Sequence, residues 1–348
     1  MMLALMLYAR VLPLEAAEVK NIVIQKVESR LLFTYDLEGE ESTALVSVYV
    51  TVGDKTYPAK SLHLEGDLGK VRPGRNRRVV WSVLSDFPGG VYQAVSVEIS
   101  AGMPSIINNI GMTFVLLPAG SVLMGSPADE PGRNTDEMQE RVTIRAFYLQ
   151  TTEVTQGQWK RVMGTNPSRF SDCGEDCPVE QVTWYDAQAF IRKLNALEGT
   201  NRYRLPTEGE WEYGARAGTA TAYYWGNGPD CSRANYGNSL WGSECKGVNP
   251  GKTLKVGSFR PNAWGLYDMT GNVWEWVDNW YGPYNSIRIT DPAVSRSGVF
   301  RVQRGGAWDS DAAACRTALR VKALPDVRLG HLKLNAGNLG FRLARTAE

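Results

Sequence analysis

Residues 265–276 read GLYDMTGNVWEW. This stretch places two glycines, bulky aromatic side chains and two carboxylates within a short distance, a composition that neither an amphipathic helix nor an alternating strand requires. Asp268 and Glu275 can converge across a turn at Gly271, where left-handed or close backbone geometry costs little. Carboxylate and carbonyl oxygens around such a turn suit a hard cation, so we expect calcium here rather than zinc.

Further motifs lie on both sides of this stretch, in order over about residues 108–345. They are GMTF at 111–114, PAG at 118–120, MGS at 124–126, TEVT at 152–155, PVEQVTW at 178–184, RLPTEGEWE at 204–212, RGG at 304–306 and LGFR at 339–342. Together they resemble the signature of the formylglycine-generating enzyme (sulfatase-modifying factor) family. The resemblance implies an α+β domain, a loop-rich variant of the C-type-lectin fold. It specifies the fold more closely than the activity, because function resides in a site carried on the fold.

The resemblance also implies how calcium would be held. Asp268 and Glu275 would bind the ion by side chain, and Gly271 and Val273 by backbone carbonyl, in a closed structural site. A second calcium site of the family is matched only by Asn235-Tyr236, without the downstream aspartate. Since a closed site leaves no coordination position for a sugar, calcium-dependent sugar binding is the weaker hypothesis.

Length and charge bound the remaining possibilities. The chain has 348 residues, which suggests about two domains. Its 38 basic and 37 acidic residues give a net charge of +1, so charge provides no reason to expect nucleic acid or an anionic membrane as partner. We expect a protein or cell-surface ligand instead. The sequence does not predict the oligomeric state.

Residues 18–102 have the pattern of an all-β module. Val46, Val48, Val50 and Val52 alternate with other residues at the period of a half-buried strand, and turn residues recur at the spacing of a sandwich. We predict an immunoglobulin-like sandwich over 18–102, which would act as a spacer or docking unit. A linker follows, and the formylglycine-generating-enzyme-like domain occupies 108–348.

Residues 1–17, MMLALMLYARVLPLEAA, form a short apolar segment that ends in small residues. The segment is too short to span a bilayer and lacks the basic start of a full secretion signal. We interpret it as the remnant of a signal peptide, with a disordered or misassigned start as the alternative. On this interpretation the protein is bacterial and exported, to the extracellular space or the cell surface.

Five cysteines are present. Cys173 and Cys177 bracket one tight loop, Cys231 and Cys245 bracket another, and Cys315 is left over. Either pair suits a loop-closing disulfide in an oxidising compartment, and free buried thiols are the alternative. A zinc site does not fit, because no C-x2-C spacing occurs and the two histidines are far from both pairs.

Three helices are predicted from capping boxes, in which a threonine begins the helix and a polar side chain three residues later returns a hydrogen bond. The boxes pair Thr155 with Gln158, Thr183 with Asp186, and Thr207 with Glu210. Apolar residues follow each box at helical spacing, and we expect those stripes to face the core.

The resemblance implies one candidate activity. Enzymes of the family that oxidise a cysteine to formylglycine use two cysteines, whose soft thiolates hold Cu(I). Counting forward from Gly306 places Ser310 and Cys315 at those positions, and counting back from Arg320 places neither on Cys315. The pair is absent by either count. We therefore expect a non-catalytic protein, with a formylglycine-generating-type oxidase as the alternative.

The carboxyl-terminal segment indicates ligand binding. It resembles the variable region of proteins diversified by retroelements, in which adenines of asparagine codons are replaced. Glu, Gln, Met and Trp cannot arise from that codon, and none occurs from Asp309 to Arg345. Lys322 and Lys333 do not fit it either. The predicted ligand-binding residues are Trp308, Asp309, Ser310, Asp311, Ala314, Leu319, Val321, Ala323, Leu324, Val327, Leu329, His331 and Lys333. The alternative is an ordinary surface with apolar loops.

Overall fold

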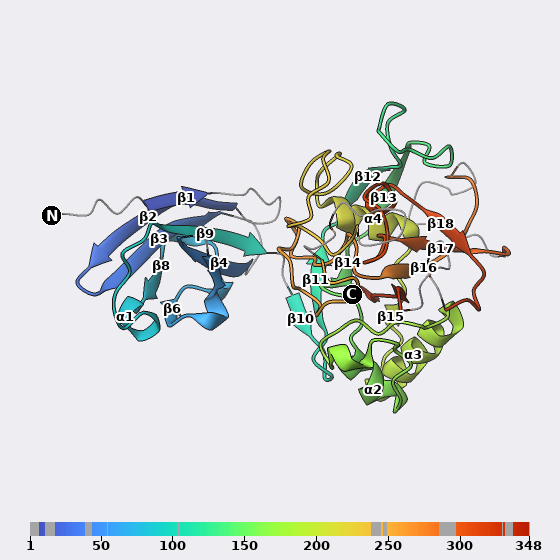
Figure 1. The fold of residues 1–348 in the computed structure, drawn as a ribbon, viewed down its shortest axis with the longest axis horizontal. Helices are drawn as coiled ribbons and strands as arrows, with labels where there is room; N and C mark the ends of the chain where they lie inside the picture. Colours follow the sequence, from blue (N-terminus) through green and yellow to red (C-terminus); the bar gives the residue numbers. More distant parts are fainter. Residues whose placement is uncertain are drawn as a thin grey trace. The chain divides into compact units, whose positions relative to one another are not determined.

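The computed structural model describes residues 7–10, 18–38, 44–53, 55–102, 105–237, 245, 249–284, 297–328, 330 and 337–347. The chain forms two compact units, Met1–Ser105 and Ile106–Glu348 (Figure 1). Each unit has a core of its own. In the described part of the chain no helix is both long and apolar enough to cross a membrane.

The first unit consists of two sheets. One has the strand order β1-β9-β4-β5, with β7 also paired to β4, and the other has the order β2-β3-β8-β6. The elements are β1 (Leu7–Arg10), β2 (Glu18–Val27), β3 (Arg30–Glu38), β4 (Ala44–Val52), β5 (Lys55–Pro58), η1 (Ala59–Ser61), β6 (Leu64–Gly66), β7 (Gly69–Val71), β8 (Gly74–Trp81), α1 (Val83–Asp86) and β9 (Val95–Gly102).

Alternating residues of both sheets fill one core. The four valines at 46, 48, 50 and 52 are buried as predicted, and Phe33 and Trp81 meet them from the opposite sheet. Two sheets around a shared core are the arrangement of an immunoglobulin-like sandwich. Of the segment interpreted as a signal remnant, Leu7–Arg10 is described, and it pairs in parallel with β9.

The second unit contains three sheets with the strand orders β10-β11-β14-β20-β15, β12-β13 and β18-β17-β16-β19. Its strands are β10 (Ser105–Ile107), β11 (Thr113–Leu117), β12 (Gly120–Met124), β13 (Glu140–Ile144), β14 (Phe147–Gln150), β15 (Tyr203–Arg204), β16 (Trp274–Trp280), β17 (Arg301–Arg304), β18 (Val321–Ala323), β19 (Leu339–Gly340) and β20 (Ala344–Thr346). Its helices are α2 (Gln156–Met163), η2 (Ser171–Cys173), α3 (Trp184–Leu197), α4 (Glu208–Arg216) and η4 (Ala313–Cys315). This mixed, loop-rich architecture is the predicted fold class.

The three predicted capping boxes are confirmed. Thr155, Thr183 and Thr207 are the N-cap residues of α2, α3 and α4, and each accepts a hydrogen bond from the backbone N–H three residues later. The side chain at that later position accepts in turn from the N-cap N–H. Each box satisfies donors that the first helical turn would otherwise leave without partners.

The turn at Gly271 shows why glycine is needed there. Its φ is +79°, and a Cβ on this residue would lie 2.3 Å from the carbonyl oxygen of Asn235. The turn leads into β16, which pairs antiparallel with β17 and parallel with β19. Trp274 and Trp276 of β16 are buried in the core of this unit.

Both predicted cysteine pairs form disulfides. Cys173 is bonded to Cys177, and Cys231 to Cys245. Cys315 is a buried thiol that belongs to neither disulfide.

Candidate functional site

The second unit contains a cavity of about 420 Å³ beside β18. It is lined by Gly132, Asn134, Tyr281, Asp311, Ala313, Ala314, Leu319, Arg320, Val321 and Lys322. Gly132 and Asn134 come from the loop between β12 and β13, and Tyr281 directly follows β16. Asp311 lies just before η4, and the other residues belong to η4, β18 and the turn between them. Because β18 pairs with β17 and β17 with β16, the sheet places Tyr281 against the carboxyl-terminal segment.

Four of the predicted ligand-binding residues line this cavity. They are Asp311, Ala314, Leu319 and Val321. Leu319 and Val321 are only 6% and 9% exposed, so their side chains form the inner wall of the cavity rather than projecting from the surface. The structure therefore places these four residues, from the middle of the predicted segment, around one cavity.

The predicted contact surface does not extend to Trp308, Asp309 and Ser310, which lie in the interior. The Trp308 indole donates to the carbonyl of Gly337. The Asp309 carboxylate accepts from the amide of Asn338, and the Ser310 hydroxyl accepts from a backbone N–H. These three side chains attach the loop to the rest of the domain. Because the residues around 308–310 follow no helical or strand period, the sequence did not indicate that they point inward.

The remaining predicted contact residues that are described differ in exposure. Ala323 and Val327 are half-buried and pack against the main core, whereas Leu324 is 41% exposed. Leu329, His331 and Lys333 lie outside the described residues.

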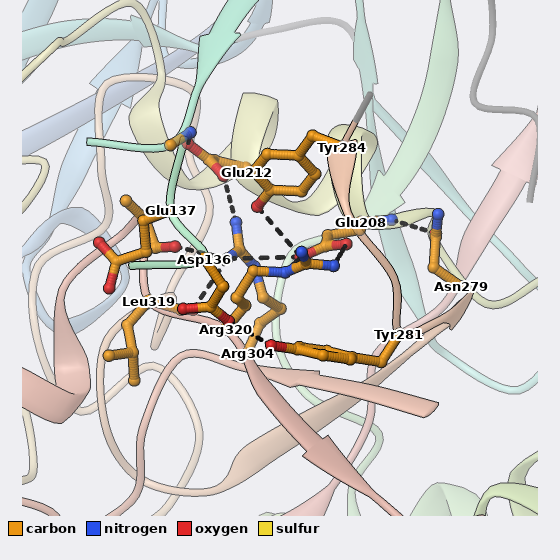
Figure 2. A network of polar contacts seen from close by, with 12 residues as sticks. Asp136, Glu137, Glu208, Glu212, Asn279, Tyr281, Tyr284, Arg304, Leu319 and Arg320 are labelled. Atoms are coloured by element: carbon orange, nitrogen blue, oxygen red, sulfur yellow. Dashed lines mark hydrogen bonds and ion pairs between the residues drawn. The ribbon is translucent and has the colours of Figure 1, made fainter. Parts of the chain in front are cut away.

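Buried ion pairs support the floor of the cavity. Figure 2 shows Arg304 and Arg320 between Glu208 and Glu212, with Tyr284 beside them. Arg320 donates twice to Glu208, through Nε and Nη2, both at 2.8 Å. Arg304 pairs with Glu212 and donates at 2.8 Å to the carbonyl of Leu319. These bonds fix the backbone at 318–320 independently of the neighbouring side chains.

Arg316 joins η4 to the loop between β12 and β13. Its guanidinium donates to the carboxylates of Glu130 and Glu137 and to the carbonyl of Gly132, at 2.6 to 2.8 Å. Burial alone would raise the pKa of Glu137, but the hydrogen bonds from Arg316 and Ser126 outweigh it and hold that pKa below its usual value. The ion pairs thus fix two walls of the cavity to each other.

The residues predicted to hold calcium have other contacts. Both oxygens of Glu275 accept hydrogen bonds from Arg342, at 2.7 to 3.0 Å, and one also accepts from the Trp211 indole. Asp268 accepts from the N–H of Gly257 at 2.6 Å. The Gly271 N–H donates to Gly305. In the described ranges no group of three or more His, Cys, Asp or Glu side chains is placed to hold a metal.

A second carboxyl group, that of Glu153, contacts Asp268. Burial raises the pKa of both groups, that of Asp268 to about 6, and the charge of Asp268 raises the pKa of Glu153 further. Two buried carboxyls in contact need a proton or a cation between them. The carboxylate of Asp268 is therefore suited to bind a cation. Both oxygens of Glu275, by contrast, already accept hydrogen bonds from Arg342.

Ser310 and Cys315, the two positions that the forward count from Gly306 gives, are both interior. The Sγ atom of Cys315 packs against Gly306, where an added Cβ would lie 2.3 Å from the sulfur. Ser310, at the other position, hydrogen-bonds to the backbone of Ala307.

Six residues of the cavity are not among the predicted contacts: Gly132, Asn134, Tyr281, Ala313, Arg320 and Lys322. Asn134 and Tyr281 lie far from the carboxyl-terminal segment in sequence, and only strand pairing brings them to it. Lys322 lies within the segment and is not among the predicted contacts, and lysine does not fit the asparagine-codon set.

Comparisons with known proteins agree with the fold. Residues 107–347 match the model of the sulfatase-modifying factor enzyme 1-like domain. The mouse (Mus musculus) formylglycine-generating enzyme is 28% identical over 291 residues, which cover 66% of this chain and 74% of that protein.

Two solved structures are similar. Treponema denticola variable protein 1 has a TM-score of 0.58 and 28% identity, over 70% of this chain and 99% of that one. The structure of PvdO from Pseudomonas aeruginosa has a TM-score of 0.61 and 29% identity, over 71% and 99%.

Proposed function

This chain belongs to the sulfatase-modifying factor enzyme 1-like family, and from that premise we propose that it is a non-catalytic protein that binds a ligand in the cavity beside β18. The observation that carries the proposal is that Asp311, Ala314, Leu319 and Val321, predicted as contact residues from the sequence, line that one cavity. The ligand is a protein or a cell-surface molecule.

The backbone of the cavity wall is held by residues other than those predicted to contact the ligand. The buried arginines at 304, 316 and 320 hold the backbone through carboxylates outside the segment. The side chains between them contribute little to those bonds. Such a scaffold tolerates different residues at the cavity wall, which is the property that a diversified binding surface needs. The structural likeness to Treponema denticola variable protein 1 supports the same conclusion.

Export remains part of the proposal. Two loop-closing disulfides are typical of proteins that mature in an oxidising compartment. They are compatible with an extracellular or cell-surface location.

The DNA on either side of the gene tests the diversification. We expect a near-copy of the codons for residues 305–345 that differs at adenines, next to a reverse transcriptase. Flanking DNA without such a copy would contradict diversification, and the cavity would then be a binding site of fixed sequence.

The alternative function is formylglycine-generating oxidation, which the likeness to the mouse enzyme favours. It is tested by incubating the protein with copper and a cysteine-containing sulfatase peptide and measuring the aldehyde by mass spectrometry. We expect none, because Ser310 occupies one of the two thiol positions and Cys315 is buried. Aldehyde formation that is lost in Cys315→Ser would establish the alternative.

A further inference from the structure

Lys322 is the exposed cation of the cavity beside β18. It lies on β18 between Val321 and Ala323 and lines the cavity together with Val321. Its ammonium lies 5.5 Å from the ring centroid of Tyr281 and 5.6 Å from that of Phe300. Aromatic faces attract a cation at such distances, so the two rings hold this long side chain at the cavity wall.

The other basic groups of the cavity are neutralised. Arg320, which also lines it, is paired with Glu208, and Arg316 behind it is paired with Glu130 and Glu137. Within the described ranges Lys322 has contacts with aromatic rings and no ion pair. The charge of Lys322 is therefore available to a ligand.

The rest of the wall is mainly apolar. Leu319, Val321, Ala313 and Ala314 supply aliphatic surface beside the ammonium. Asp311 is the acidic residue of the wall, and its carboxylate accepts a hydrogen bond at 2.7 Å from the backbone N–H of Ala314. That bond ties Asp311 to η4, whereas Lys322 has no comparable tie to the backbone.

We infer that the ligand is an acidic polypeptide segment, which places an apolar side chain against Leu319 and Val321 and a carboxylate against Lys322. The inference rests on the proposed binding function and names its partner. Lysine is not a product of the asparagine codon, so Lys322 supplies the same charge whatever residues diversification places at 319 and 321. Opposite charge fixes the orientation of the segment and accelerates its association.

Selection of random short peptides displayed on phage, on the immobilised full chain, tests this inference. We expect the captured peptides to carry Asp or Glu next to an aliphatic or aromatic residue. Lys322→Glu should shift the preference toward Lys and Arg. Lys322→Met should weaken the captured peptides about three- to tenfold, as loss of a partly exposed charge pair does.

A matched variant serves as the control. Lys193→Glu changes an exposed lysine of α3 and should leave the acidic preference intact. Thermal melting of each variant confirms that it is folded.

The outcomes separate the inference from the proposed function. If the wild-type protein captures peptides without an acidic preference, or if Lys322→Glu captures the same peptides, the inference is wrong and the binding function stands. If the wild-type protein captures no peptide, the inference is overturned, whereas binding of a cell-surface molecule of another class is not.

Discussion

At the scale of single residues, Val302 and Val321 carry the same side chain on neighbouring strands but have different surroundings. Val302 is fully buried and paired with Lys322, whereas Val321 lines the cavity beside β18. The cost of a polar replacement depends on whether water or a partner can reach the new group. The cavity residues are therefore expected to tolerate changes that the core does not.

This difference predicts the effects of asparagine, the residue of the proposed template codon, at the two positions. Val321→Asn should lower the free energy of unfolding by about 1 kcal/mol, because its amide can be hydrated from the cavity. Val302→Asn should lower it by about 3 kcal/mol or more, because its amide is buried without partners. Denaturant unfolding measures both values, and equal losses would contradict a wall that tolerates diversification.

Asp86 is a second residue whose surroundings give a prediction. Its carboxylate accepts from the backbone N–H of His63, from the Trp81 indole at 2.7 Å, and lies 2.6 Å from the His63 ring. Burial alone would raise the pKa of Asp86, but these hydrogen bonds outweigh it and lower the pKa. A lowered pKa in the folded state stabilises the protein above the unfolded pKa of about 4, and that stabilisation disappears as the pH falls through the folded pKa.

Asp86→Asn should accordingly destabilise the first unit at neutral pH, by about 1.5 to 3 kcal/mol, the range for hydrogen bonds to a charged group. The difference from wild type should shrink as the pH falls toward about 3. Glu65→Gln changes an exposed carboxylate of β6 and is the matched control. A loss that does not change with pH would show that the charge of Asp86 is not its source.

At the scale of elements, two carboxyls are neighbours, that of Asp268 in the segment before β16 and that of Glu153 between β14 and α2. Because they are buried and in contact, both pKa values are raised, and ionising them without a counterion is unfavourable. We propose that calcium binds at Asp268 and neutralises this pair. Glu275 belongs instead to the ion pair with Arg342, which fixes β16 to the segment after β19.

Calcium removal tests this proposal. At neutral pH a chelator should lower the melting temperature of the second unit, and added calcium should restore it. Binding at a hundredfold excess over the dissociation constant corresponds to about 2.7 kcal/mol. Asp268→Asn should melt at the same temperature with and without chelator, and Asp129→Asn, an exposed change, should behave as wild type. If the wild-type melting curves with and without chelator coincide, calcium does not bind at Asp268.

At the scale of the whole molecule, the two units have separate cores and separate sheets. Units with independent cores unfold independently unless an interface couples them. Each unit can also be destabilised separately. The substitution of Asp86 acts on the first unit, and a chelator or reduction of the disulfides acts on the second.

Calorimetry of the full chain should therefore show two transitions. Asp86→Asn should shift one of them, while chelator and reductant should shift the other, because both disulfides and Asp268 belong to the second unit. A single transition that moves with all three perturbations would show that the units unfold together.

The sequence by itself determined the local structure. The capping boxes at Thr155, Thr183 and Thr207, the alternation through Val46–Val52 and the closely spaced cysteine pairs all depend on residues that are near one another in the chain. Short-range hydrogen bonds and the periods of helix and strand suffice to predict such features. The ordered motifs added the fold family, and that identification was confirmed.

Only the tertiary structure decided which side chains reach the cavity. Gly132, Tyr281 and Leu319 meet there because β16, β17 and β18 pair and Arg316 fixes a distant loop. The inward orientation of Trp308 and the pairing of Glu275 with Arg342 were decided in the same way. In a loop without periodicity the direction of a side chain is set by long-range packing and ion pairs, which neighbouring residues in the sequence do not encode.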